Sequence, residues 1–451
     1  MENVDLDYVS DRRALRSFVL SSLSTDSRSL KKDDLFIALK GEHFDGHSFI
    51  GSAVEKGAGG VLFEVRSLDS VRTLMKKVPS ILFIGVGNTR RALGKIAENY
   101  LGLFSLTKIA VTGSVGKTTT KGLIASVLSQ RYDVVSSIQS YNNDIGVPKT
   151  VLEVEERVQF LVQEMGTNHP GEIANLSGIV HQNGTVITSI GPAHIGFFGS
   201  ELGIAREKKA ALDALDRDGT AFLNADDRHF SFLQQGIAAA VKSYGIYEGD
   251  VRPDRIERIS LDGSLFVLWG KQISARVLGE HGIRNAMAAA LVGLTYGLTI
   301  DEVKEGIETH RDESGRGNVR VTGGVTFIDE SYNANPLSVS ASLRFLEQIR
   351  TDGKKVFILG DMLELGEQSE FYHRKLGEEL KTTGIGYLYT YGPLAHVTGI
   401  EVQKEGERTV RHFTDPDELI ESLRGEVLSG DVILVKGSRK MGLERVVNAF
   451  F

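Results

Sequence analysis

A single glycine-rich segment constrains the fold more than any other part of the sequence. It reads Thr112-Gly113-Ser114-Val115-Gly116-Lys117-Thr118-Thr119-Thr120 and follows the apolar run Ile109–Val111. After it, apolar residues recur at helical spacing, at Leu123, Ile124, Val127 and Leu128. The segment therefore predicts a strand, a tight glycine loop and the N-terminus of a helix.

A glycine loop that precedes a helix is suited to binding phosphate. The first N–H groups of a helix have no intrahelical partner and lie at the positive end of its dipole. Gly113 and Gly116 let backbone amides approach a phosphate, Lys117 supplies charge for the outer phosphates, and the Thr118 hydroxyl suits Mg²⁺. The usual phosphate loop has four residues between its glycines and this one has two, which points away from common GTPases and kinases. The alternative is a plain strand-to-helix turn.

Composition limits the class of protein. A chain of 451 residues favours two or three domains, and a net charge of −7 offers no basic field for nucleic acid. The absence of cysteine excludes disulfides, cysteine zinc sites and thiol catalysis. The N-terminus lacks an apolar signal core, and the most apolar stretch, residues 286–298, is short and interrupted by glycine. We therefore expect a cytoplasmic protein without membrane insertion, in which this stretch forms a buried helix.

Strand and helix patterns alternate along the chain, which predicts an α/β fold of three domains. Residues 1–106 hold expected strands at 35–39, 61–63 and 81–84. Residues 107–312 hold expected strands at 109–112, 158–163 and 186–189, which implies a central parallel sheet. Residues 313–451 have expected strands at 325–329, 356–359, 387–391 and 432–435 in a Rossmann-like pattern, without the G-x-G-x-x-G signature of dinucleotide binding. The charged stretch 311–318 is expected to be a linker.

Candidate metal ligands follow the strands beside the glycine loop. Glu164 ends the run Phe160–Gln163, and a carboxylate at the C-terminal end of such a strand is placed to hold Mg²⁺. His194 follows the next strand and could bind metal or phosphate oxygens; the alternatives are a solvated Glu164 and a structural His194. Lys208 lies in a charge run that is typical of a solvated helix face.

Four further segments combine polar side chains with turn residues. Residues 224–227 are interpreted either as a base-recognition loop or as a turn, and the amide side chains of residues 142–148 leave the same choice open. Arg316, between two glycines, is expected to be exposed, where it could stabilise a transferring phosphoryl group or stay a solvated linker residue. Residues 329–336 end the first strand of the last domain, where α/β sheets bind ligands.

These motifs together resemble the Mur ligases, the ATP-dependent amide-forming enzymes of bacterial cell-wall synthesis. The resemblance runs essentially end to end. It rests on the shortened loop and on Asp26–Arg28, Leu35–Glu42, Asp45–His47, Asn142-Asn143 with Gly146 and Pro148, Glu164–Gly166, Ser331–Pro336, Leu359–Met362, Glu364–Gly366 and Lys436–Arg439. Within the family, the Ser-Tyr-Asn-Ala-Asn-Pro and Asp-Met-x-Glu-Leu-Gly segments are similar to the MurF type.

The resemblance implies a three-domain Mur ligase architecture with a central P-loop parallel-sheet domain and a Rossmann-like C-terminal domain. The N-terminal domain would bind the UDP substrate, and the C-terminal domain would bind the incoming dipeptide and cap ATP. ATP and Mg²⁺ are the implied cofactors, and UDP-MurNAc-tripeptide and D-alanyl-D-alanine are the implied partners. We expect a monomer. A Mur-type ligase that adds one amino acid, a P-loop phosphotransferase and a nucleotide-dependent switch are the alternatives.

The resemblance also implies roles for individual residues. The implied catalytic residues are Lys117, His194, Lys208 and Arg316. The implied ATP contacts are Gly113, Ser114, Val115, Gly116, Lys117, Thr118, Thr119, Asn224, Asn285, Arg316 and Asp329. The implied substrate contacts are Ser27, Arg28, Asn142, Asn143, Asn333, Asn335 and Asp361. The implied metal ligands are Thr118, Glu164, His194 and, if carbamylated, Lys208. Two departures stand out: Ala210 replaces a usual glutamate after the modified lysine, and Asp329-Glu330 replaces a usual pair of aspartates.

Overall fold

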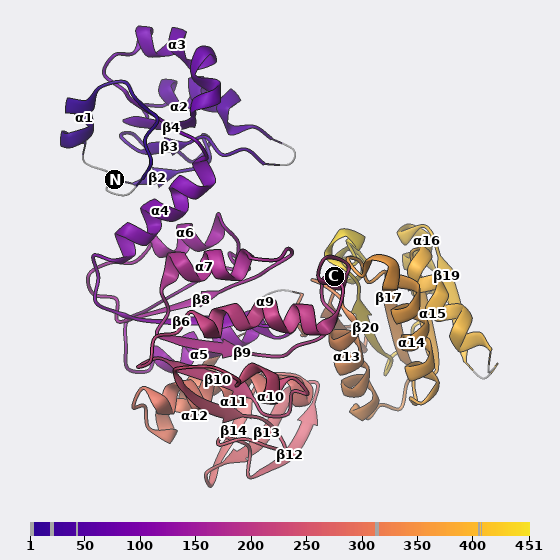
Figure 1. Cartoon of the computed structure of the whole chain (residues 1–451). Coiled ribbons are helices and arrows are strands. Elements are labelled where there is room, and N and C mark those ends of the chain that lie inside the picture. Colours follow the sequence, from indigo (N-terminus) through magenta and orange to yellow (C-terminus); the bar gives the residue numbers. More distant parts are fainter. Residues whose placement is uncertain (1–3, 19–21, 42–43, 312–314, 405, 407) are drawn as a thin grey trace. The chain divides into compact units, whose positions relative to one another are not determined.

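The chain forms two compact units in the computed structural model, which describes residues 4–18, 22–41, 44–311, 315–404, 406 and 408–451. The first unit comprises Met1–Ser105 and Asp144–Glu153, and the second comprises Leu106–Asn143 and Val154–Phe451. Figure 1 labels the elements of both units. Of the expected linker, residues 312–314 lie outside the described residues. No helix in the described part of the chain is both long enough and apolar enough to span a bilayer.

The first unit is built on a five-stranded sheet in the order β1-β5-β4-β3-β2, in which only β1 is antiparallel. The strands are β1 (Tyr8–Val9), β2 (Leu23–Ser24), β3 (Leu35–Ile37), β4 (Gly60–Glu64) and β5 (Leu82–Val86). The helices are α1 (Arg12–Ser17), α2 (Ile50–Glu55), α3 (Leu68–Lys77) and α4 (Thr89–Leu101). Along β3, Phe36 enters one apolar cluster and its two neighbours enter another, so both faces of the sheet are buried.

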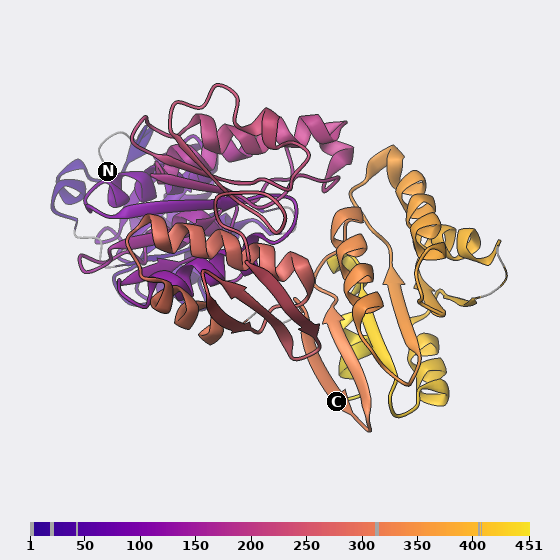
Figure 2. The same ribbon diagram turned by 90° about the horizontal axis from the view of Figure 1, so that it is seen from below.

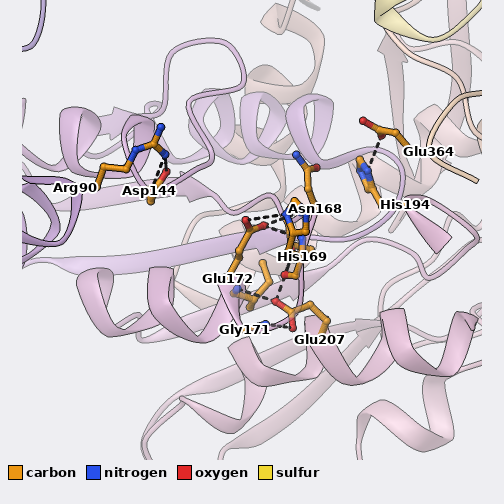
Figure 3. Close-up of polar contacts among 11 residues, drawn as sticks. Arg90, Asp144, Asn168, His169, Gly171, Glu172, His194, Glu207 and Glu364 are labelled. Atoms are coloured by element: carbon orange, nitrogen blue, oxygen red, sulfur yellow. Dashed lines mark hydrogen bonds and ion pairs between the residues drawn. The ribbon is translucent and has the colours of Figure 1, made fainter. Parts of the chain in front are cut away.

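A later segment of the chain joins this first unit. Helix α6 (Gly146–Val151) packs against α4, and Ile145 and Leu152 contact the apolar cluster beneath that helix. Arg90 of α4 pairs with Asp144 at 3.1 Å (Figure 3) and also donates to the carbonyl of Lys40. The segment is therefore anchored at its start by charge and along its length by apolar packing.

The second unit contains a central sheet of six parallel strands in the order β11-β10-β9-β6-β8-β7. The parallel sheet and three of its strands were predicted, and the strand order was not. The strands are β6 (Thr107–Thr112), β7 (Val134–Ser136), β8 (Phe160–Glu164), β9 (Gly184–Ile187), β10 (Thr220–Asn224) and β11 (Ala240–Tyr244). The helices are α5 (Lys117–Leu128), α7 (Glu172–Val180), α8 (Ile195–Phe198), α9 (Glu201–Asp213), α10 (Phe230–Leu233), α11 (Gly279–Thr295) and α12 (Ile300–Thr309).

Helix α11 is buried, which confirms the interpretation of its apolar stretch. It packs against α5, and α12 packs against both. A Cβ on Gly293 of α11 would lie 2.6 Å from Cγ1 of Val127 on α5, so the glycine lets the two helices approach closely. This packing fixes α5, and with it the glycine loop that precedes it.

An antiparallel sheet that the sequence analysis did not predict adds to this core. Its strands are β12 (Arg255–Ser260), β13 (Gly263–Leu268) and β14 (Lys271–Ala275). Phe266, Leu268, Ile273 and Ala275 point into the cluster that also holds α5 and α11. The strand signal is weak in β12, where every residue is exposed or only partly buried.

The last sheet has the order β15-β16-β20-β17-β18-β19, and only β15 runs antiparallel. Its strands are β15 (Asn318–Thr322), β16 (Val325–Glu330), β17 (Lys355–Gly360), β18 (Tyr387–Tyr391), β19 (Thr409–Phe413) and β20 (Val432–Lys436). Its helices are α13 (Pro336–Gln348), α14 (Ser369–Lys381), α15 (Pro393–Gln403), α16 (Pro416–Glu426) and α17 (Glu444–Asn448). This sheet, orange to yellow in Figure 2, has helices on both faces, as the Rossmann-like pattern predicted; the antiparallel edge strand was not predicted.

Candidate active site

The glycine loop lies between β6 and α5, as predicted. Gly113 and Gly116 have φ values of +150° and +85°, which favour glycine. A Cβ at Gly113 would collide with Oγ1 of Thr188, and a Cβ at Gly116 would lie 2.7 Å from Oδ1 of Asn285. Both positions therefore require glycine for space as well as for backbone conformation. The predicted ATP contact Asn285, on α11, lies directly against the loop.

The segment after β9 holds the glycine loop in place. The N–H of Ser114 donates to the carbonyl of Ser189 at 2.7 Å, and its hydroxyl donates to the carbonyl of Gly191 at 2.9 Å. The Thr188 hydroxyl donates to the carbonyl of Val115 at 2.6 Å. These bonds fix the loop before any ligand binds, which lowers the cost of ordering it around a phosphate.

Residues 224–227 hold that segment from the other side. The Asn224 amide donates to the carbonyl of Thr188 at 3.0 Å, and its oxygen accepts from the N–H of Asp226. Asp227 accepts from the N–H of Ile190 at 2.7 Å. The geometry favours a structured turn here, and the predicted contact between Asn224 and adenine stays a prediction.

Glu164 brings three distant parts of the sequence together. It ends β8, pairs in register with Val111 of β6, and is only 1% exposed. The Thr118 hydroxyl donates to Oε2 of Glu164 at 2.7 Å, and the Asn142 amide donates to Oε1 at 2.8 Å. The interpretation of Glu164 as a solvated residue is therefore wrong, because the carboxylate is buried at the start of the phosphate-loop helix.

Two lysines, Lys117 and Lys208, lie close enough to Glu164 to interact with its charge. Lys117 donates to the carbonyl of Gly113 at 3.0 Å, and burial lowers its pKa, while Glu164 opposes this and Arg316 adds to it. Lys208, only 3% exposed on α9, has its pKa lowered to about 7 by burial and by the charge of Lys117. The interpretation of Lys208 as part of a solvated helix face is wrong, because this face of α9 packs inward.

Glu207, beside Lys208, is a residue that the sequence analysis missed. It accepts from the N–H groups of Gly171 at 2.7 Å and Ile173 at 2.9 Å (Figure 3), so it holds the first turn of α7. The sequence did contain a signal for Glu207, since Ile204, Glu207 and Ala211 recur at helical spacing on one face of α9. The structure buries all three.

Arg316 is partly buried, so the expectation of an exposed linker arginine is wrong. Its guanidinium lies 4.0 Å from the centre of the Tyr332 ring, and Nη2 donates to the Ser140 hydroxyl at 3.0 Å. The Tyr332 hydroxyl donates to the same Ser140 oxygen at 2.8 Å. Nε of Arg316 is buried and has no hydrogen-bond partner among the described residues, which leaves a donor for an anion.

His194 contacts the loop after β17. Its Nδ1 lies 2.7 Å from Oε2 of Glu364 (Figure 3), and this contact lowers the pKa of Glu364. Glu364 belongs to the Asp-Met-x-Glu-Leu-Gly segment, but sequence reasoning gave it no role in the site.

The structure distributes the remaining predicted residues over both units. In the first unit, Arg28 is exposed and its pair with Asp26 lowers the pKa of that aspartate to about 2, while Ser27 is buried. In the second, Asn335 caps α13, and Asp361 accepts from the N–H of Ala395 at 2.7 Å in the first turn of α15. Burial raises the pKa of Asp361.

The remaining residues that were predicted to contact ATP or substrate differ in their exposure. Asn143 and Asn333 are exposed, and the Asn333 side chain accepts from the neighbouring N–H of Ala334. Thr119 is partly buried in the first turn of α5. Asp329 is buried and its carboxylate accepts from the N–H and hydroxyl of Ser331. The roles of these residues stay predictions.

The site fits Mg²⁺ in a specific way. Among the described residues, no three histidine or acidic side chains form a group that could hold a metal ion. Mg²⁺ does not need one, because it keeps several waters and binds through one or two carboxylates together with substrate phosphates. A buried carboxylate joined to the hydroxyl of the phosphate loop, as Glu164 is to Thr118, meets that requirement.

Models of known protein families match most of this chain. The family models match in chain order: "Mur ligase family, catalytic domain" at residues 19–101, "Mur ligase middle domain" at 111–293 and "Mur ligase, glutamate ligase domain" at 315–439. The UDP-N-acetylmuramoyl-tripeptide–D-alanyl-D-alanine ligase of Bacillus subtilis is 34% identical over 95% of this chain and 93% of its own length.

The chain belongs to the Mur ligase family and, within it, to the MurF type. Solved Mur ligase structures agree. A MurF structure from Acinetobacter baumannii is 31% identical with a TM-score of 0.86, covering 96% of this chain and 93% of its own. MurF from Thermotoga maritima in complex with ADP is 28% identical with a TM-score of 0.81, covering 95% of this chain and 96% of its own. The predicted Mur ligase fold is confirmed.

Proposed function

We propose that this protein is an ATP-dependent ligase of peptidoglycan precursor synthesis. It joins D-alanyl-D-alanine to UDP-N-acetylmuramoyl-tripeptide and releases ADP and phosphate. The observation that carries the reaction type is the meeting of Lys117, Thr118 and Glu164 at one phosphate loop. The substrates are those named for relatives that match nearly the whole chain.

The chemistry explains why ATP is needed. A carboxylate does not react with an amine until it is activated. The terminal carboxylate of the tripeptide would attack the γ-phosphorus of ATP, giving an acyl phosphate and ADP. The amine of D-alanyl-D-alanine would then attack the acyl carbon, lose a proton and expel phosphate. Most of the acceleration would come from positioning and charge stabilisation.

The second unit supplies the groups for this step. Lys117 and Arg316 would neutralise charge on the transferring phosphoryl group, and the contacts of Arg316 with Tyr332 and Ser140 fix its plane. Thr118, Glu164 and His194 would hold Mg²⁺, which when bound neutralises phosphate oxygens. We assign the nucleoside side of ATP to Asn224, Asn285 and Asp329.

Lys208 is proposed to be carbamylated. A lysine with a pKa of about 7 is neutral in about half of the molecules near pH 7, and the neutral amine can attack CO₂ and lose a proton to form a carbamate. This change would replace a buried positive charge beside Lys117 by a negative one that could hold a second Mg²⁺. Ala210, where the family usually has a glutamate, removes one expected neighbour of that group.

The remaining assignments follow the proposed domains. Residues 1–106 would bind the uridine nucleotide through Ser27 and Arg28. Residues 107–312 would bind ATP, with Asn142 and Asn143 toward the acceptor. Residues 313–451 would bind the dipeptide through Asn333, Asn335 and Asp361. We place the enzyme in the cytoplasm, as a monomer without nucleic-acid partners.

Product analysis tests the proposal. The enzyme is given ATP, Mg²⁺ and UDP-MurNAc-tripeptide, with D-alanyl-D-alanine, with single amino acids or with no second substrate. The proposal predicts phosphate release and a UDP-MurNAc-pentapeptide mass only with the dipeptide. A product extended by one amino acid would replace the substrate and keep the mechanism. A phosphorylated acceptor without free phosphate would instead indicate a phosphotransferase.

A further inference from the structure

Two segments of the second unit contact each other near His194. One follows β9 and contains residues 194–199, including the short helix α8, and the other is the loop after β17 and contains residues 364–368. Besides the contact between His194 and Glu364, the N–H of Gly196 donates to the carbonyl of Glu364 at 3.2 Å. The Gln368 amide donates to the carbonyl of Gly199 at 3.3 Å. The segment that contains His194 therefore contacts one that lies 170 residues further along the sequence.

The backbone of both loops is shaped for this contact. His194 has φ +59° and Glu364 has φ +65°, a left-handed conformation that is uncommon for non-glycine residues. A Cβ on Gly196 would lie 2.8 Å from the N of Gly366, and a Cβ on Gly366 would lie 2.8 Å from Cα of Gly196. The two glycines thus let the strained residues face each other.

Stability does not account for this arrangement. The Glu364 side chain is 42% exposed, and an ion pair at that exposure contributes little to the free energy of unfolding. Two left-handed non-glycine residues cost more than such a pair returns. Backbone strain of this kind is common at functional sites. We therefore infer that Glu364 acts on the imidazole of His194.

We propose that Glu364 is a positioning residue that presents Nε2 of His194 to the metal. A neutral imidazole has one N–H and one lone pair, and a carboxylate oxygen 2.7 Å from Nδ1 favours the proton on that nitrogen. Nε2 then carries the lone pair that a metal requires. Histidine ligands in metal sites are commonly oriented by a carboxylate in this way. The inference rests on the proposed function, because it takes His194 as a metal ligand.

One consequence concerns the last sheet. Glu364 follows β17 of the last sheet, whereas Glu164 ends β8 of the central sheet and Thr118 lies in the first turn of α5. The metal site would therefore be complete only when the loop after β17 contacts residues 194–199. Metal binding and this contact would then strengthen each other. A metal that binds more tightly when the contact is formed also stabilises the contact by the same free energy.

The test uses Mn²⁺ as the probe, bound to the full-length protein in the presence of ADP. Electron paramagnetic resonance gives both the affinity for Mn²⁺ and the hyperfine coupling to a ligand nitrogen. Glu364→Gly is the informative variant, because it removes the carboxylate and suits the positive φ. We expect it to unfold no earlier than the wild type and to bind Mn²⁺ about 10-fold or more weakly. Glu364→Gln, which keeps an acceptor oxygen, should recover most of the affinity.

A matched control and a ligand variant separate the possible outcomes. Glu367→Ala removes an exposed carboxylate from the same turn and should leave the Mn²⁺ affinity unchanged. His194→Ala should abolish the nitrogen coupling, and if the coupling persists, the metal role of His194 in the proposed function fails. If His194→Ala abolishes it while Glu364→Gly binds Mn²⁺ like Glu367→Ala, the proposed function stands and the positioning role of Glu364 is overturned.

Discussion

The hydroxyl of Thr118 donates a 2.7 Å hydrogen bond to Oε2 of Glu164, joining the first turn of α5 to the end of β8. The other carboxylate oxygen accepts from Asn142 at 2.8 Å. These contacts orient the carboxylate at the phosphate loop with neutral donors, and its negative charge interacts with the nearby Lys117 and Lys208. A negative charge at this position also attracts Mg²⁺, which is the basis of the first prediction.

Glu164→Gln should raise the Mg²⁺ concentration needed for phosphate release and lower kcat/KM by at least about 100-fold, because Mg²⁺ loses its charged protein ligand. The amide still accepts from Thr118, so the fold should persist. A magnesium titration of phosphate release measures the effect. Glu156→Gln, an exposed carboxylate before β8, is the control. An unchanged requirement for Mg²⁺ in Glu164→Gln would remove Glu164 from the metal site.

Lys117→Ala should abolish turnover and leave the fold intact. The ammonium is held at the loop by the Gly113 carbonyl, where a phosphate would use it, and removing one such group costs about 10²- to 10³-fold or more in kcat. Phosphate release and circular dichroism check the two parts of the prediction. Lys375→Ala on α14 serves as an exposed control. Near-normal ligation by Lys117→Ala would contradict the phosphate-loop assignment.

Two glycine variants should behave in opposite ways. Gly113→Ala places a Cβ against Thr188 and should weaken ATP binding and stability, since the loop must move away from residues 188–191. Gly178→Ala lies in an exposed part of α7 with open space around it and should stabilise the protein by about 0.5–1 kcal/mol. Nucleotide titration and urea unfolding measure both. Equal ATP affinity in the two variants would show that the close fit at Gly113 is unimportant.

Arg316→Lys should lower kcat about 100-fold with a smaller change in KM for ATP, because lysine keeps the charge but loses the planar stack on Tyr332 and the fork of donors. Tyr332→Phe keeps the ring and loses the bond to Ser140, so its effect should be several-fold smaller. Steady-state kinetics at varied ATP concentration separate kcat from KM. Full activity in Arg316→Lys would show that only the charge matters.

The low pKa of Lys208 predicts a pH-dependent stability. In the unfolded chain the amine has its ordinary pKa of 10.5, and in the folded protein its pKa is about 7, so the unfolded state binds more protons between these pH values. The Lys208 contribution to the free energy of unfolding therefore rises with pH through that window. Below it, the buried charge imposes its full penalty.

Lys208→Met removes this penalty. Relative to the wild type in buffer depleted of CO₂, the variant should be most stabilised near about pH 6, and the gap should shrink by about 2–3 kcal/mol by about pH 9, at about 1.4 kcal/mol per pKa unit. Urea unfolding at both pH values measures the gap. A gap independent of pH would mean that Lys208 stays charged in the folded protein. Catalysis should be lost in the variant at every pH.

The sequence predicts the parts of the fold and site that local patterns encode. The glycine loop, the parallel strands and the buried helix α11 each follow from spacing within a few residues. Strands β12 and β15 were missed, and both have weak burial patterns and lie at sheet edges. Strand β13 was missed as well, although it is mostly buried and lies in the middle of its sheet.

Properties that depend on distant partners could not be read from the sequence. The burial of Lys208 depends on how α9 packs, and the position of Arg316 depends on Tyr332 and on Ser140, which lies 176 residues away. The role of Glu364 depends on a loop after another sheet. A charge run or a pair of flanking glycines looks the same in the sequence whether or not such partners exist.

The central claim is that the acceptor carboxylate is activated by phosphorylation and then joined to D-alanyl-D-alanine. It is tested most directly with UDP-MurNAc-tripeptide whose terminal carboxylate carries ¹⁸O, followed by mass spectrometry of the product and the released phosphate. The account predicts that one labelled oxygen appears in phosphate and that the other stays in the new amide of UDP-MurNAc-pentapeptide. Unlabelled phosphate, or a labelled phosphorylated acceptor without amide formation, would contradict it.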